Sequence, residues 1–253
     1  MDGDGYDVRS LALSFRVGTV VNGHRHPWGQ LVFAAAGVMR VVTDSTAWLT
    51  PPTRAIWVPA LVPHHIEMVT PVSMRTLYLA PELAALLPTA PEVLAVAPLL
   101  RELILHILGI GMLSPEQPQQ ARVAGMLIDL LLTAGREDLS LPLPRDPRAL
   151  KLARHWQQHP DDERDIADLC ANFGGSLRTV QRLFQRETGL TVEAWRQKAR
   201  LLHGMARLSS GASVTDTALA SGYRSVSAFA TAFRKQFGVS PGKFGQKKGA
   251  GSE

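Results

Sequence analysis

The sequence SLRTVQRLFQRETGLT fills residues 176–191, and a related sequence, SVSAFATAFRKQFGVS, fills residues 225–240. In each, a serine can cap a helix by accepting from an unpaired amide, and apolar residues four apart share one helix face. A glycine after a basic last turn can end the helix in the left-handed conformation. The sequence therefore predicts two helices of one design. The matched positions are Ser176/Ser225, Val180/Phe229, Phe184/Phe233, Arg186/Lys235, Gly189/Gly238 and Thr191/Ser240.

A short helix and a glycine turn are expected before each of these segments. The first helix is predicted at residues 166–173, before Gly174-Gly175, and the second at residues 214–220, before Gly222. A helix, a turn and a capped basic helix form the helix-turn-helix pattern. A helical bundle can show one such unit by chance, but two with matched caps and ends indicate a DNA-binding domain. The two modules are expected at about residues 161–189 and 212–238.

Charge is distributed unevenly along the 253 residues. Residues 1–144 carry 9 Arg against 12 Asp and Glu, a net charge of −3. Residues 145–248 carry 18 Lys and Arg against 9 Asp and Glu, a net charge of +9. A basic domain next to a mildly acidic one suggests that the C-terminal part binds a polyanion, and a solvated basic face is the alternative.

Residues 148 to about 244 resemble the paired helix-turn-helix domain of AraC/XylS-type bacterial transcription regulators. The segments that carry the resemblance are TVQRLFQRETG (179–189), SGYRSVSAF (221–229) and FRKQFGVSP (233–241). Residues 192–208 match the long helix that joins the two modules in that family, whereas Cys170 and Thr217 replace residues that are usually small or aliphatic. The resemblance implies a sequence-specific regulator of transcription that binds double-stranded DNA, forms a homodimer and contacts RNA polymerase.

The two capped helices are expected to read DNA with their exposed faces. Arginine can bond guanine and glutamine can bond adenine through paired contacts, and small side chains can contact a thymine methyl group. Most sequence discrimination is expected from the first helix. The expected base contacts are Arg178, Thr179, Gln181, Arg182, Ser227 and Thr231. The expected phosphate contacts are Arg186, Arg224, Arg234 and Lys235.

The N-terminal part favours an antiparallel β barrel or sandwich followed by helices. Short runs rich in β-branched and aromatic residues alternate with Gly, Pro, Asn and Asp, at residues 31–33, 39–42, 55–58 and 74–79. Helical spacing follows at 98–108 and 119–133. The strongly apolar second helix is either deeply buried or meets another subunit, and dimerisation through it is expected. The predicted class is α+β with two domains. The predicted parts are an effector domain (1–82), a dimerisation segment (83–139), a proline-rich linker (140–147) and the DNA-binding domain (148–246).

Three histidines in the β region have the spacing of the cupin motifs. His24 and His26 precede Gln30, and His64 ends the later segment PALVPH. The region thus resembles the cupin effector domain of this regulator family, although Gln30 replaces the usual glutamate and Leu61 the usual glycine. The resemblance implies a cupin barrel. Two interpretations stay open. Three imidazoles can hold a divalent transition metal, or His24, His26, Gln30 and His64 can hydrogen-bond a small-molecule effector.

Other features narrow the function. The longest apolar run, residues 31–39, is far below the roughly 18 to 20 residues of a membrane span, and the acidic N-terminus MDGDGYDVRS is not typical of a secretory signal. The single cysteine, Cys170, is expected to pack between helices, and a reduced cytoplasmic setting fits best. We expect a regulator rather than an enzyme. The alternative is a cupin metalloenzyme or metal sensor fused to a DNA-binding domain.

Overall fold

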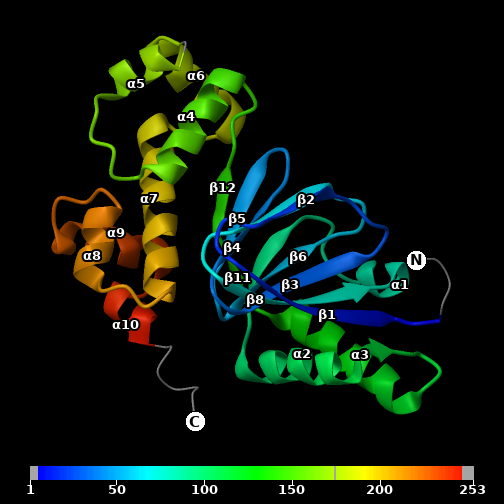
Figure 1. The fold of residues 1–253 in the computed structure, drawn as a ribbon. Coiled ribbons are helices and arrows are strands. Elements are labelled where there is room, and N and C mark those ends of the chain that lie inside the picture. Colours follow the sequence, from blue (N-terminus) through cyan, green and yellow to red (C-terminus); the bar gives the residue numbers. More distant parts are fainter. Residues whose placement is uncertain (1–4, 174, 247–253) are drawn as a thin grey trace. The chain divides into compact units, whose positions relative to one another are not determined.

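The computed structural model describes residues 5–173 and 175–246, which form two compact units (Figure 1). The first unit contains residues 5–43 and 48–140, and the second contains residues 44–47 and 141–246. Gly174, the first glycine of an expected turn, lies outside the described residues. Within the described part of the chain, no helix combines the length and apolar character needed to cross a membrane.

The first unit is built on two antiparallel sheets. One has the order β10-β1-β8-β3-β6-β9-β11, and the other contains β5-β4-β7-β2. The four expected strand regions lie in β3, β4, β6 and β8, so the antiparallel β class is confirmed. The strands are β1 (Val8–Phe15), β2 (Val20–His24), β3 (Gly29–Ala36), β4 (Met39–Val42), β5 (Thr46–Thr50), β6 (Arg54–Val58), β7 (His64–Met68), β8 (Val72–Leu79), β9 (Glu92–Ala95), β10 (Met112–Leu113), β11 (Arg136–Glu137) and β12 (Ser140–Pro142).

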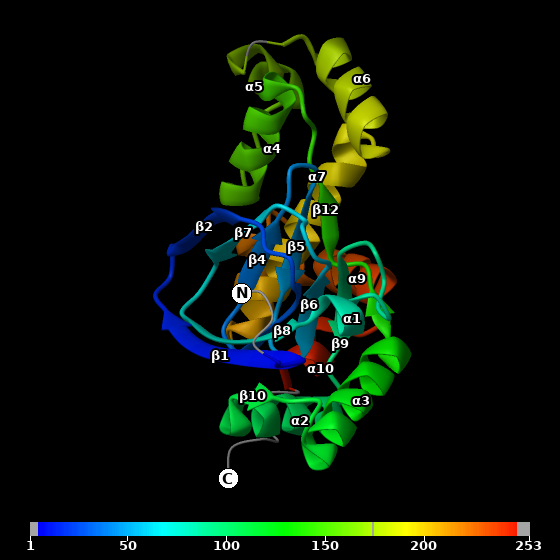
Figure 2. The same cartoon turned by 90° about the vertical axis from the view of Figure 1, so that its right-hand side faces the viewer.

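Two apolar cores lie on the two faces of the larger sheet. Between the sheets, side chains of β3, β6 and β8 pack on those of β4 and β7. On the other face, α2 (Pro98–Ile110) and α3 (Pro118–Thr133) cover the sheet, and the short α1 (Pro81–Ala84) follows β8 (Figures 1 and 2). The helical segment therefore shares one core with the strands that precede it.

The apolar stripe of α3 is covered within its own chain. Leu127 and Leu131 are 0% and 1% exposed and belong to the core formed with α2 and the sheet. Of the two alternatives for this stripe, burial within the chain is confirmed. The expectation that a second subunit covers Leu127 and Leu131 is wrong, because α2 and the sheet supply the partner surface. Two apolar side chains of α3 stay exposed, Met126 at 40% and Leu132 at 43%.

The second unit is helical, and its two modules have the expected caps. Ser176 accepts from the Thr179 amide and Ser225 accepts from the Ala228 amide, at 3.2 and 3.1 Å. Each of these two capped helices ends at a left-handed glycine, Gly189 or Gly238 (φ 73° and 72°). The helices are α4 (Pro147–Gln158), α5 (Ile166–Asn172), α6 (Leu177–Thr188), α7 (Val192–Ser209), α8 (Val214–Ala220), α9 (Val226–Phe237) and α10 (Pro241–Gln246).

Aromatic side chains form the centre of each module. Trp156, Phe184 and Trp195 contact one another around the N-terminal half of α7, and Phe229 and Phe233 are buried in the second module. The expected linker joins this packing, because the Trp195 indole donates to the Pro142 carbonyl oxygen at 2.6 Å. Cys170 is buried in α5, and burial raises the pKa of its thiol. This is consistent with a packing role.

Candidate functional site

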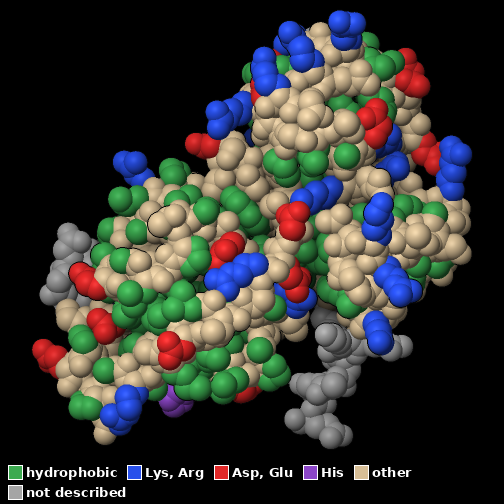
Figure 3. Space-filling view, turned by 180° about the vertical axis from the view of Figure 1, so that it is seen from behind, with side chains coloured by type: hydrophobic (Ala, Val, Ile, Leu, Met, Phe, Trp, Pro, Cys, Tyr) green, Lys and Arg blue, Asp and Glu red, His purple; other side chains and the backbone are tan. Residues whose placement is uncertain are grey.

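Helix α6 presents a polar and basic face to solvent. Burial of Val180, Leu183 and Phe184 turns the opposite face outward. The exposed side chains recur three or four residues apart, so they share one face. They are Arg178, Gln181, Arg182 and Gln185. Lys and Arg side chains stand out on the surface of this unit (Figure 3).

Two residues expected to contact DNA from α6 also have partners inside the protein. The Thr179 hydroxyl lies 3.0 Å from the hydroxyl of the Ser176 cap, and Thr179 is half-buried. Arg186 forms an ion pair with Glu187 at 2.6 Å, although its own side chain stays 62% exposed. Glu187 also accepts from the backbone amides of Arg145 and Asp146, at 2.7 and 2.9 Å. This role of Glu187 was not predicted from the sequence.

Helix α9 exposes small and basic side chains. Burial of Phe229 and Phe233 leaves Ser227 and Thr231 exposed, while Phe237 is half-buried. Arg224, Arg234 and Lys235 are exposed as well. In the described part of the chain none of these three cations forms an ion pair, so all three are available to an external anion.

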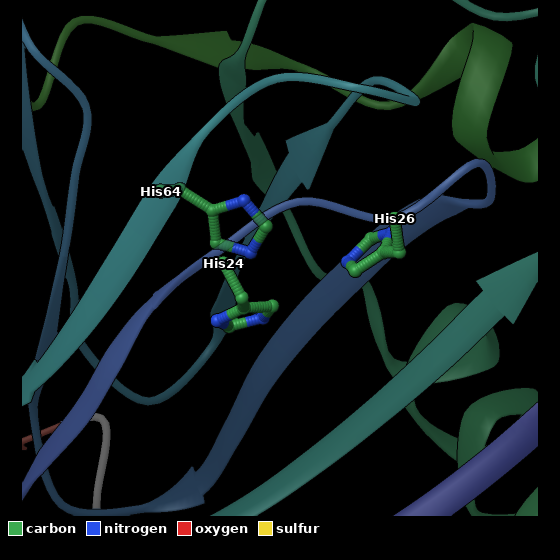
Figure 4. A group of neighbouring side chains, drawn as sticks. All are labelled: His24, His26 and His64. Atoms are coloured by element: carbon green, nitrogen blue, oxygen red, sulfur yellow. The ribbon is translucent and has the colours of Figure 1, made fainter.

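The three histidines and Gln30 come together in the first unit. His24 ends β2 directly opposite His64, which begins β7, so both side chains point to the same face. His26 lies in the connection to β3, where Gln30 follows. One ring nitrogen from each histidine lies within 4.8 Å of the others, and Figure 4 shows the three rings around one space. His65 points away from them and bonds Glu67 at 3.3 Å.

Backbone carbonyl groups fix the protonation of all three rings. The Nδ1 atoms of His24, His26 and His64 lie 2.8, 2.7 and 2.8 Å from the carbonyl oxygens of Asn22, Trp28 and Val62. A carbonyl oxygen only accepts, so each Nδ1 carries the hydrogen and each Nε2 keeps a lone pair. Burial lowers the pKa of His64 to about 4, which keeps this ring neutral near pH 7.

Gln30 adds a fourth acceptor to the cluster. The Thr76 hydroxyl donates to the Leu31 carbonyl oxygen (3.1 Å), so its own oxygen accepts from the Gln30 amide nitrogen (3.0 Å). The same NH₂ group donates to Tyr78 Oη at 3.1 Å. The Gln30 oxygen is thereby turned toward Nε2 of His26 and His64, at 3.2 and 3.0 Å. With both Nε2 atoms unprotonated, these are close contacts between acceptors, which a cation or a donor between them would relieve. Converging acceptors attract either a cation or a hydrogen-bond donor.

Thr76 and Tyr78 were missed as parts of this cluster. Tyr78 pairs with Gln30 across β3 and β8, and Thr76 lies two residues before Tyr78 in β8. Both residues lie in a predicted strand, but placing them beside Gln30 requires knowing that this strand pairs with β3.

Leu61 holds the loop before His64 in a strained conformation. Its φ is 63°, in the left-handed region that favours glycine, and its side chain is 62% exposed. Its amide donates to the His26 carbonyl oxygen at 2.8 Å. This contact ties the loop to the histidine cluster.

Comparisons with known proteins agree with both units. Residues 17–153 match the family described as "AraC-like ligand binding domain", and residues 169–247 match "Helix-turn-helix domain". The HTH-type transcriptional regulator NimR of Escherichia coli (strain K12) is 30% identical over 221 residues, 87% of this chain and 81% of NimR. The transcriptional activator NphR of Rhodococcus sp is 36% identical over 127 residues, 48% of this chain and 38% of NphR. A structure of ToxT from Vibrio cholerae O395 aligns with a TM-score of 0.43 at 10% identity, over 96% of this chain and 99% of ToxT.

Proposed function

Because this chain belongs to the AraC family of transcription regulators, we propose that it binds its DNA sites through α6 and α9 and that a small molecule bound at the histidine cluster controls it. The observation that carries the DNA part is the pair of equally capped helices with exposed polar and basic faces. Homodimer formation, contact with RNA polymerase and a cytoplasmic location are parts of the same proposal.

Helices α6 and α9 each supply base contacts and phosphate contacts in this proposal. We assign base contacts to Arg178, Thr179, Gln181 and Arg182 of α6, with Ser227 and Thr231 of α9 at thymine methyl groups. We assign phosphate contacts to Arg186, Arg224, Arg234 and Lys235. The longer side chains of α6 support a larger share of sequence discrimination for the first module.

Duplex binding by two single variants tests this division. Arg182→Ala is expected to weaken binding to the cognate duplex by roughly 1 to 3 kcal/mol and to relax preference at one base pair. Lys235→Ala is expected to weaken all duplexes alike and to reduce the slope of log affinity against log salt by about 1. If Arg182→Ala changes neither affinity nor preference, the assigned orientation of α6 is wrong.

The acceptor cluster supports an effector that presents a positive charge or hydrogen-bond donors. His24, His26, His64 and Gln30 all offer acceptor atoms to the space between them. An effector that fills this space is expected to bind more weakly to His26→Ala. DNA binding in the absence of effector is expected to persist in that variant, because the reading helices belong to the other unit.

A transition metal is the second candidate ligand, and the chemistry of the donor atoms supports it. Three neutral imidazole nitrogens and an amide oxygen suit Zn²⁺ or Ni²⁺ better than metals that prefer carboxylates. The backbone carbonyls that bond each Nδ1 are the outer partners that usually orient metal-binding histidines. A bound metal would act as a charge that polarises an effector group.

Elemental analysis of untagged protein separates the two ligands. A metal site predicts about one transition-metal ion per chain, lost in His26→Ala and weakened below roughly pH 6. If the protein contains no stoichiometric metal, the ligand of the cluster is instead an effector with hydrogen-bond donors. We propose no catalytic role. A turnover screen of the metal-loaded protein tests the alternative of a cupin enzyme, and multiple turnovers would contradict our proposal.

A further inference from the structure

A cavity of about 300 Å³ lies between the two helix-turn-helix modules, against the helix that joins them. One face of α7 supplies four of the lining residues, spaced three or four apart. The start of α5 and the segment between α8 and α9 supply the other two. The lining residues are Ile166, Glu193, Arg196, Gln197, Arg200 and Tyr223.

Two arginines in this lining bond no carboxylate directly, although Asp161, Asp162 and Glu163 lie close enough to interact with their charges. Arg196 donates through Nη2 to the Asp162 carbonyl oxygen, and Arg200 donates through Nε to the Pro160 carbonyl oxygen at 2.7 Å. Neither forms an ion pair with any described residue. A guanidinium has five N–H groups, so each arginine keeps donors beyond the single bond that it makes here. Burial lowers the pKa of both groups, and the charge of Arg200 lowers the pKa of Arg196 further.

Tyr223 contributes a hydroxyl group without a partner. Its Oη atom is buried and makes no hydrogen bond within the described part of the chain. Such a group costs about 1 to 3 kcal/mol when it stays unsatisfied. Burial raises the pKa of the phenol to about 12, so the hydroxyl keeps its proton and can donate.

Gly222 fixes the turn beside Arg200. Its φ is 75°, and a Cβ at this position would lie 2.6 Å from the Pro160 carbonyl oxygen and 2.7 Å from Nη2 of Arg200. The guanidinium is therefore held against the turn that carries Tyr223. The donors of the cavity are set before any ligand arrives.

We propose that this cavity binds an oxyanion, a phosphate or carboxylate group held by Arg196, Arg200 and Tyr223. An oxyanion would supply a directly bonded counter-charge for both arginines and an acceptor for the hydroxyl. Glu193 is the one acid among the lining residues and opposes binding. The anion has two sources, a free small molecule or a phosphate of the DNA backbone. Either anion would contact residues of α7 and of the turn before α9, and would thus connect the second module to the joining helix.

Calorimetric titration of the full chain with inorganic phosphate at constant ionic strength tests the site. Saturable binding is expected. Arg196→Gln and Tyr223→Phe are expected to weaken it roughly tenfold, since each removes a hydrogen bond to a charged group. Glu193→Gln is expected to strengthen it. Arg207→Gln, on the same helix but outside the cavity lining, is the matched control and should change nothing.

Tyr223→Phe keeps the test valid if Arg196→Gln disturbs folding, because it removes only the hydroxyl. Phosphate binding that is equal in all these variants would overturn the proposal. So would the absence of phosphate binding together with an unchanged salt slope for DNA in Arg196→Gln.

Duplex binding in chloride buffer then distinguishes the sources. If the cavity holds a backbone phosphate, free phosphate competes with DNA and Arg196→Gln reduces the salt slope by about 1. If it holds a small anion, Arg196→Gln leaves duplex affinity unchanged and phosphate still binds the protein–DNA complex. Both results support the oxyanion site.

Discussion

Phe229 of α9 packs so closely against Gly204 of α7 that a Cβ atom at position 204 would lie 2.7 Å from Cε2 of the ring. Phe229 is fully buried, and its helix exposes Ser227 and Thr231 on the other face. A glycine inside a helix weakens that helix by about 0.5 to 1 kcal/mol relative to alanine. Here the missing side chain lets the second module dock directly on the joining helix.

Gly204→Ala is therefore expected to destabilise the protein in spite of the better helix former. The new methyl group must displace the Phe229 ring, and overpacking of this kind costs roughly 1 to 3 kcal/mol. We expect a net loss of about 1 to 2 kcal/mol in the free energy of unfolding, measured in urea.

Gly125 of α3 provides the matched control. A Cβ there would meet no atom within 4 Å, so Gly125→Ala should stabilise by about 0.5 to 1 kcal/mol. An equal gain from Gly204→Ala would contradict the close packing with Phe229.

The helix ends of the second unit were predictable because they depend on neighbours in the sequence. Ser176 and Ser225 bond amides three residues away, and Gly189 and Gly238 end the helices that these caps begin. Such short-range rules need no knowledge of the tertiary fold. The two modules and their exposed faces followed from them.

The packing of the first unit was less accessible to sequence reasoning. Gln30 and Thr76 are 46 residues apart, and their hydrogen bond depends on the pairing of β3 with β8. The burial of Leu127 depends on where α2 packs. An apolar stripe predicts that something covers it but does not identify the covering surface. The histidines were found because their spacing resembles a known motif.

Dimer formation through α3 remains a prediction. Because the buried stripe of α3 is covered within the chain, the interface would lie on the exposed side of this helix. Met126 and Leu132 are the exposed large apolar residues of α3 in the described part of the chain, so a second subunit would cover them. Met126→Glu together with Leu132→Glu is expected to give a folded monomer in sedimentation experiments. Leu127→Glu is unsuitable, because it would place a charge in the core of the chain. A double variant that stays dimeric would place the interface elsewhere.

Leu61→Gly is expected to stabilise the first unit. The left-handed conformation costs a non-glycine residue roughly 1 to 2 kcal/mol, and the exposed side chain loses little burial. The greater freedom of glycine in the unfolded chain removes about 0.5 to 1 kcal/mol of this gain. Urea unfolding should therefore show a gain of about 0.5 to 1 kcal/mol.

Ala60→Gly is the control for this change, because φ at position 60 is not positive. It should lower stability by about 0.5 to 1 kcal/mol, the entropic effect of glycine alone. A loss of stability in both variants would mean that the φ of Leu61 carries no strain.

The pH dependence of stability should report the buried ring of His64. Its pKa falls from 6.5 to about 4 on folding, chiefly through burial. Above pH 6.5 the ring is neutral in both states and has no effect. As the pH falls toward 4, the unfolded chain binds the proton first, so the free energy of unfolding decreases. The full decrease is on the order of 3 kcal/mol.

Urea unfolding of chelator-treated protein from about pH 7 to about pH 4 measures this decrease. His64→Gln keeps a polar side chain but cannot titrate, so its stability should fall less over the same range. His106→Gln, at an exposed position of α2, should follow the unmodified protein. Chelation matters, because a bound metal would hold the ring neutral and shift the loss to lower pH. A His64→Gln curve that parallels the curve of the unmodified protein would show that His64 does not cause the acid sensitivity.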